Sequence, residues 1–188
     1  MDRNYTFLKN NKWFHKGYTL VPIRDEDKFL IMKWRNEQLF HLRQNSPLTV
    51  VDQKRYFKNV VNKLFETDVP DQILFSLLQN DVCIGYGGLV HINWTDMNAE
   101  ISFVMNTELE KLEFEKNWEI FLNLIQKIAF EEVHFHKIYT FAFDLRPRLY
   151  AALTHEGFKE EARLSEHVRH LDTFIDVLIH SKFNTRLS

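Results

Sequence analysis

The spacing of hydrophobic positions changes along the chain, and each spacing predicts one kind of element. Alternating or short continuous apolar runs predict strands over residues 18–24, 72–78, 82–92, 99–105, 137–143, 158–164 and 167–180. Apolar residues three and four positions apart predict helices over residues 25–36, 49–68, 114–129 and 147–156. Short turns between the second, third and fourth strands indicate an antiparallel meander, and the helix after them indicates a crossover to a parallel neighbour. This order predicts an α/β (α+β) fold, with a mixed sheet flanked by helices.

The composition favours a single domain. The chain has 188 residues, of which 45% are hydrophobic, and this is enough for one core. We expect the domain to span residues 17–183, between an N-terminal extension (1–16) and a short tail (184–188). Because 24 basic and 26 acidic residues give a formal charge of −2, the chain lacks the basic footprint of a nucleic-acid-binding protein. No apolar run approaches the ~20 residues of a transmembrane helix, and no signal peptide is evident, which predicts a cytoplasmic protein without a membrane partner.

The cysteine and histidine content bears on cofactors. Cys83 is the single cysteine, so the sequence has neither an intrachain disulfide nor a cysteine-based zinc cluster. It falls on a predicted strand, where a buried apolar role is expected. The nine histidines show no metal-ligand spacing, and we expect no metal site. The sequence leaves homodimer formation open.

Five short strings occur in an informative order. They are residues 84–89 (Ile-Gly-Tyr-Gly-Gly-Leu), 99–105 (Ala-Glu-Ile-Ser-Phe-Val-Met), 129–130 (Ala-Phe), 136–139 (His-Lys-Ile-Tyr) and 156–161 (Glu-Gly-Phe-Lys-Glu-Glu). In this order they resemble the GCN5-related N-acetyltransferase (GNAT) superfamily over nearly the whole chain. The resemblance implies a sheet whose fourth and fifth strands splay apart, acetyl-CoA as co-substrate and a small amine as acceptor. It implies donor-binding roles for the fourth strand and its surroundings: Phe103, Val104, Met105, Asn106 and Trp118.

A narrower resemblance concerns the acceptor. The tripeptide Trp34-Arg35-Asn36 resembles acetyltransferases that modify amino sugars on nucleotide carriers, where the pair lies in the acceptor region. Arginine offers a planar fork to phosphate or carboxylate, and asparagine offers a donor and an acceptor to sugar hydroxyls. Both residue types also suit an ordinary helix C-terminus. The His-Lys-Ile-Tyr string resembles ribosomal-protein alanine acetyltransferases instead, in which the position of His167 faces the acceptor.

One segment departs from the family. GNAT enzymes bind the CoA pyrophosphate in a glycine-rich loop before the central helix, where backbone amides converge on the phosphates. Residues 107–117 contain no glycine and carry four glutamates against two lysines. Thr107 and Glu110 form a capping-box pattern, which would use the free amides internally. Arg146 stands where the family has asparagine and is a candidate for the displaced phosphate contact. A GNAT-fold binding module that has lost CoA binding is therefore an alternative to an enzyme.

Direct transfer to an amine needs a base and an oxyanion donor. Glu100 is the first candidate for the base, because strand alternation sets it opposite Ile101 and Phe103 in the splayed segment. His91, acting through water, is the second. A solvent-facing carboxylate and an ordinary strand-end histidine are the structural alternatives.

The remaining roles are an oxyanion donor and an acid. We expect the amide near Val104 or Met105 to hold the oxyanion. The tyrosine that the family uses as acid is Leu153 here, and Tyr150, nearly one helical turn earlier, is the candidate replacement. A core-edge packing role for Tyr150 is the structural alternative.

Overall fold

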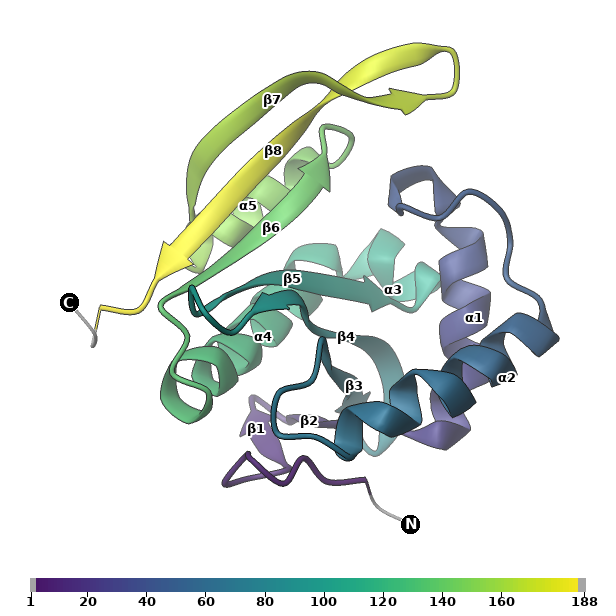
Figure 1. Cartoon of the computed structure of the whole chain (residues 1–188). Coiled ribbons are helices and arrows are strands. Elements are labelled where there is room, and N and C mark those ends of the chain that lie inside the picture. Colours follow the sequence, from purple (N-terminus) through teal and green to yellow (C-terminus); the bar gives the residue numbers. More distant parts are fainter. Residues whose placement is uncertain (1–2, 186–188) are drawn as a thin grey trace.

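The computed structural model describes residues 3–185, and within them one sheet of eight strands runs in the order β1-β2-β3-β4-β5-β6-β8-β7 (Figure 1). The strands are β1 (Trp13–His15), β2 (Tyr18–Pro22), β3 (Ile73–Gln79), β4 (Val82–Asn93), β5 (Asn98–Met105), β6 (Lys137–Phe143), β7 (Lys159–His170) and β8 (Thr173–Phe183). Only β5 and β6 pair in parallel, and the other neighbours in the described sheet are antiparallel. The predicted mixed sheet is confirmed.

Helices cover both faces of this sheet. They are α1 (Lys28–Glu37), α2 (Val50–Asn59), α3 (Thr107–Leu112), α4 (Phe114–Lys127) and α5 (Pro147–His155), with 3-10 turns at 25–27, 39–41 and 61–65 and a π turn at 128–132. In α4, Phe121 stacks on Phe103 of β5 with 4.1 Å between ring centroids. Helix α1 reaches the sheet through Arg35, which donates to the Tyr86 hydroxyl on β4. Since Phe103 is registered with Gly87, the neighbour of Tyr86, the two helices lie on opposite faces.

The strands β5 and β6 separate soon after they meet. Their register covers only residues 98–100 of β5 against residues 137–139 of β6, and Figure 1 shows the two ribbons diverging beyond that point. Each strand keeps a full antiparallel partner on its other edge, β4 for β5 and β8 for β6. The gap therefore opens without disrupting either ladder. The splay implied by the family resemblance is present.

Two glycines let β4 lie close to its neighbours. A Cβ at Gly87 would lie 2.1 Å from the Ser102 carbonyl oxygen, and one at Gly88 would lie 1.9 Å from that of Ile73. Backbone cannot yield at such distances without separating the strands, so glycine is required at both positions.

We expect Gly87→Ala to lower the free energy of unfolding by about 1–3 kcal/mol, as overpacking of a close contact does. Urea denaturation measures this change. Val82→Ala is the control, because this side chain at the exposed start of the same strand is expected to contribute less than about 0.5 kcal/mol. An unaltered denaturation midpoint for Gly87→Ala would contradict the close-packing argument.

The N-terminal segment adds to the core and to the sheet. Tyr5 is 1% exposed, and its hydroxyl donates to the Leu74 carbonyl at 3.1 Å and accepts from the Leu74 amide at 2.7 Å. Trp13 is buried in β1, whereas Phe14 beside it is exposed. The sequence did not predict β1, because a three-residue strand has no readable period.

The capping box predicted at Thr107 and Glu110 does not form. Asn106 caps α3 instead, and its side chain accepts from the Glu108 amide at 3.0 Å. The Thr107 hydroxyl donates to Glu37 at 2.6 Å. Glu110 is thus free to turn its carboxylate inward, and the segment that stands where the family has its pyrophosphate loop is a short helix.

The closing hairpin also differs from prediction. The polar residues 165–166 were expected to separate two strands, with His167 at the junction, but β7 runs through them and the turn falls at residues 171–172. The register slips between Leu164 and Val168, where Glu166 has φ +49° and its amide donates to Asp176 at 2.9 Å. A bulge absorbs the polar interruption, so the strand continues.

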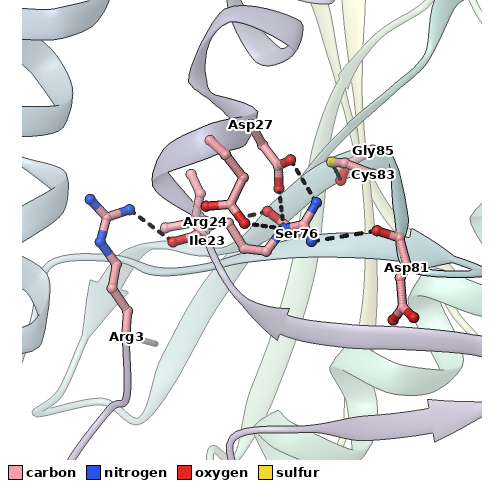
Figure 2. Close-up of polar contacts among 9 residues, drawn as sticks. Arg3, Ile23, Arg24, Asp27, Ser76, Asp81, Cys83 and Gly85 are labelled. Carbon is pink, nitrogen blue, oxygen red and sulfur yellow. Dashed lines mark hydrogen bonds and ion pairs between the residues drawn. The ribbon is translucent and has the colours of Figure 1, made fainter. Parts of the chain in front are cut away.

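An ionic cluster lies at the start of α1, and Figure 2 shows it near Cys83 and Gly85 of β4. Arg24 donates twice to Asp27 at 2.8 Å, and Asp27 is 2% exposed. Cys83 is buried beside it and directs its thiol to the Gly85 carbonyl at 3.4 Å. Burial raises the pKa of Cys83 to about 12, which makes it unsuitable as a nucleophile at neutral pH.

Candidate active site

The gap between β5 and β6 opens into a cavity of about 690 Å³. Its walls come from both faces of the sheet, because the diverging strands leave no backbone between them. Lining side chains include Arg35, Arg43, Tyr86, His91, Glu100, Ser102, Phe103, Trp118, Thr140, Phe141 and Arg146. The Thr140 hydroxyl is buried without a hydrogen-bond partner among residues 3–185. The volume falls within the range of small-molecule sites.

Glu100 lies at the point where the two strands part. It is 5% exposed and forms an ion pair with Arg43, whose guanidinium also covers the Phe141 ring at 4.7 Å. Burial raises the pKa of Glu100, although Arg43 and the nearby His91 oppose this effect. A carboxylate with a raised pKa, held in a cavity, is suited to general-base chemistry.

His91 stands beside Glu100 in an unusual backbone conformation. Its Nε2 lies 3.9 Å from the second carboxylate oxygen of Glu100. The residue has φ +48° within an irregularity of the β4–β5 ladder, between Val90 and Asn93. The bulge turns the exposed imidazole toward the mouth of the cavity, and such positions are frequent at functional sites.

The open edge of β5 presents backbone groups to the cavity. The Asn106 amide donates to Ile84 of β4 at 2.7 Å, so alternate residues direct their amides to β4 and the intervening residues direct theirs to the gap. Phe103 and Met105 therefore face the gap, whereas Val104 faces β4. The Met105 carbonyl already accepts from the Gln38 side chain at 2.8 Å. Of the two predicted oxyanion donors, the alternation directs the Met105 amide to the gap, although neither residue is among those that line the cavity.

The far end of the cavity holds a tight ionic cluster. Arg146 Nη2 lies 3.1 Å from Glu110, and Arg146 Nη1 donates to His41 Nδ1 at 3.1 Å. The Arg146 guanidinium also covers the rings of Phe114 and Trp118 at 4.9 and 5.7 Å. Burial, followed by the positive charge of Arg146, lowers the pKa of His41 to about 3, so this imidazole is neutral. Arg146 is the cluster's cation.

Of the tripeptide predicted to bind the acceptor, two residues have structural roles and one lines the cavity. Trp34 is buried in the core at 2% exposure. Asn36 binds the backbone of Leu48, donating to its carbonyl at 2.9 Å and accepting from its amide at 2.7 Å. Arg35 lines the cavity and donates to the Tyr86 hydroxyl at 2.6 Å and to Gln44 at 2.8 Å. One residue of the three is in a position to contact substrate.

Two further candidates lie outside the cavity lining. The Tyr150 hydroxyl donates to Asp144 at 3.0 Å, and its ring stacks on His180. Burial and the Asp144 carboxylate raise the pKa of Tyr150, which makes it a poorer acid. His167 is exposed on β7, and its ring lies 5.8 Å from Phe141, a residue of the cavity wall.

Sequence reasoning did not find Arg43, His41 and Glu110 as site residues. Arg43 and His41 lie in the irregular segment after α1, where neither spacing nor motif marks a polar side chain. The signal for Glu110 was present, since acidic residues in a phosphate-binding segment are anomalous, but it was interpreted as a capping pattern.

No helix within residues 3–185 is long and apolar enough to cross a membrane. The same residues contain no group of three or more histidine, cysteine or acidic side chains arranged to hold a metal ion.

A mixed sheet whose strands β5 and β6 part around a cavity has the architecture that the family resemblance implies. The family model described as "Acetyltransferase (GNAT) domain" matches residues 20–179. The chain therefore belongs to the GNAT acetyltransferase family. No curated protein matches the sequence.

Solved structures share the fold. A spermidine N-acetyltransferase from Vibrio cholerae in complex with CoA and spermine superposes with a TM-score of 0.76 at 17% identity, covering 91% of this chain and 98% of the other. A dodecameric structure of the Vibrio cholerae enzyme in an intermediate state gives a TM-score of 0.73 at 19% identity, covering 92% and 97% of the two chains. At 17–19% sequence identity, these similarities show that the fold is shared and nothing about the substrate.

Membership of the family makes this chain an acetyltransferase that uses acetyl-CoA and acts on an amine. The gap fits the extended arm of that co-substrate, because the edge of β5 supplies free backbone groups and the Thr140 hydroxyl is unpartnered among the described residues. The diphosphate end fits less simply. Arg146 is a suitable cation there, but Glu110 already occupies its guanidinium. Family membership does not distinguish among acceptors.

Proposed function

We propose that this protein N-acetylates a small acceptor that carries both a primary amine and an anionic group, of which a nucleotide-linked amino sugar is the leading example. The observation that carries the proposal is Arg35. It lines the cavity, and its hydrogen-bond partners, Tyr86 and Gln44, are neutral. No carboxylate forms an ion pair with it among residues 3–185. A half-buried guanidinium without a counter-charge is a binding site for phosphate or carboxylate.

The charges around Arg35 argue against a polycationic acceptor. Arg43 and Glu100 neutralise each other, and His41 is uncharged because its pKa is about 3. Asp71 is exposed at the rim of the cavity. The interior therefore has a positive potential at Arg35, which disfavours polyamines such as the spermine bound by the Vibrio cholerae enzyme.

The chemistry assigned to the residues follows from their positions. Acetyl-CoA supplies the activated acetyl group. Glu100 takes the proton from the acceptor amine, directly or through a water that His91 positions. Arg43 holds the Glu100 carboxylate in place. The Met105 amide, on the open edge of β5, stabilises the negative charge that develops on the acyl oxygen. The amine nitrogen forms the new amide bond to the acetyl carbon while the thioester C–S bond breaks, and the CoA thiolate leaves and takes a proton from solvent.

The proposal is tested by acceptor competition. The protein is supplied with acetyl-CoA and with one of four acceptors: a nucleotide-linked amino sugar, the same sugar without the nucleotide, spermidine, or a peptide with an N-terminal alanine. Thiol release measures the rate, and mass spectrometry identifies the acetylated product. We expect kcat/KM for the nucleotide-linked sugar to exceed that for the free sugar and for spermidine by at least about tenfold, since a charge-assisted hydrogen bond contributes roughly 1.5–3 kcal/mol.

Each other outcome contradicts the proposal in a different way. Preferred turnover of spermidine would show that the Arg35 charge does not select the acceptor. Preferred turnover of the peptide would identify an N-terminal acetyltransferase. No turnover with any acceptor, together with no CoA binding, would identify a binding module.

A further inference from the structure

The cluster of Glu110, Arg146 and His41 lies beside the N-terminus of α4. Helix α4 has 14 residues and begins at Phe114, and no side chain caps it. Arg146 and Arg148 both cover the Phe114 ring, at 4.9 and 5.0 Å. An uncapped helix N-terminus flanked by two guanidinium groups has the features of an anion site. Arg148 pairs with Glu115 of the first turn at 3.2 Å, and Glu110 is the anion that lies against Arg146.

The cluster is incompletely bonded. Two of its buried polar atoms, Glu110 Oε2 and Arg146 Nε, have no hydrogen-bond partner among residues 3–185. The same holds for Nε1 of Trp118, whose ring the Arg146 guanidinium covers. Both Arg146 and Trp118 line the cavity. Buried polar atoms without partners are costly and uncommon in native structures. Two of the three are donors, so they would be satisfied by a ligand with more acceptor oxygens than one carboxylate provides.

Helix α3, which carries Glu110, is held to the body by few contacts. None of its residues is fully buried. Glu110 contacts Arg146 and lies 3.9 Å from His41 Nε2. Leu109 packs partly buried against the core. Thr107 donates to Glu37 at 2.6 Å and accepts from Gln38 at 3.1 Å. A six-residue helix that places no fully buried residue in the core is more easily displaced than an element of the sheet.

We propose that Glu110 is an internal substitute for the diphosphate of the acetyl donor. Glu110 forms the ion pair with Arg146 when no donor is bound, and it is displaced together with α3 when the diphosphate binds to Arg146. A diphosphate carries more charge than a carboxylate and can accept from Arg146, Trp118 and the α4 amides together. Burial raises the pKa of Glu110, so the pair that it forms with Arg146 is weakened by desolvation. The affinity for the donor therefore depends on the competition between the Glu110 carboxylate and the donor diphosphate for Arg146. The glycine-free segment carries the group that the diphosphate replaces.

The proposal depends on the family's acetyl donor and not on the acceptor argued above. It is tested by calorimetry of CoA and of pantetheine, which lacks the nucleotide and the diphosphate. We expect Glu110→Gln to bind CoA about tenfold more tightly than the parent, because the competing charge is gone, and Arg146→Gln to bind it about tenfold more weakly. Neither change is expected to alter pantetheine binding. Glu108→Gln, on the exposed side of the same helix, is the control and is expected to leave both affinities unchanged.

Equal or weaker CoA binding by Glu110→Gln would overturn the proposal, and so would the absence of CoA binding in both the parent and this variant. CoA binding by the variant alone would support it. A second measurement needs no substitution: hydrogen exchange at the amides of residues 107–112 is expected to accelerate when CoA binds and to stay constant with pantetheine. Protection of this segment by CoA would show that α3 stays in place, and would overturn the displacement even if the affinities changed.

Discussion

Glu100→Gln is expected to lower kcat/KM for acetyl transfer by about 10²–10⁴-fold while leaving the affinity for CoA unchanged. General-base catalysis contributes on this scale, and glutamine cannot accept the proton. The side chain keeps its shape, so the change removes one function from the cavity without enlarging it. Stopped-time assays with the preferred acceptor measure the rate, and calorimetry with CoA measures the affinity.

The pH dependence gives a second readout of the same role. Burial raises the pKa of Glu100 above that of an ordinary glutamate, and a base functions only when it is deprotonated. The rate is therefore expected to rise with pH through this raised pKa, and the Gln variant is expected to lose that acidic limb. His91→Gln, which removes the neighbouring imidazole, is expected to cost less and to retain the limb.

A matched control separates catalysis from general damage. Glu108→Gln, at an exposed position on α3, removes a carboxylate outside the cavity and is expected to leave kcat/KM unchanged. If Glu100→Gln also retained full activity, Glu100 would be a structural partner of Arg43, and the base would have to be sought elsewhere in the cavity.

The parts of the fold that sequence predicted best are those with a strong local period. The strands β3, β4 and β5 lie within two residues of the predicted ranges, because alternation and sharp turns mark their ends. The helix α4 was found from the repeat of Phe114, Trp118 and Phe121, of which Trp118 and Phe121 pack on Phe103 of β5 as the period requires. Elements without a period, such as β1 and the 3-10 turns, could not be read from the sequence.

The site was predictable where strand alternation or chain topology determines position. Strand alternation gave the face on which Glu100 lies, whereas its place at the divergence and that of Arg35 near the acceptor were implied by the family resemblance. Other site residues come from segments without a readable period: Arg43, the partner of Glu100, from the chain after α1, and Glu110, the partner of Arg146, from a helix of six residues. Long-range pairs of this kind depend on how the segments pack, which local spacing does not encode.

Arg35→Gln is expected to raise the KM for an anionic acceptor by roughly 10–150-fold with little change in kcat. The loss corresponds to one charge-assisted hydrogen-bonded contact of about 1.5–3 kcal/mol, and each tenfold change corresponds to about 1.4 kcal/mol. Arg35 takes no part in the proposed proton transfer, so its loss is expected to weaken acceptor binding and not to slow the chemical step. An unchanged kcat would distinguish this effect from damage to Glu100.

Arg35 also supports Tyr86 and Gln44, so a structural effect must be separated from a loss of acceptor binding. Arg35→Lys retains the charge without the planar fork, and it is expected to recover part of the lost affinity. An amine acceptor that lacks an anionic group provides the internal control, because its KM is expected to stay within about threefold in both variants by the same reasoning. Equal losses for anionic and neutral acceptors would show that Arg35 maintains the shape of the cavity and does not select the substrate, whereas a loss confined to the anionic acceptor would require the guanidinium to contact it.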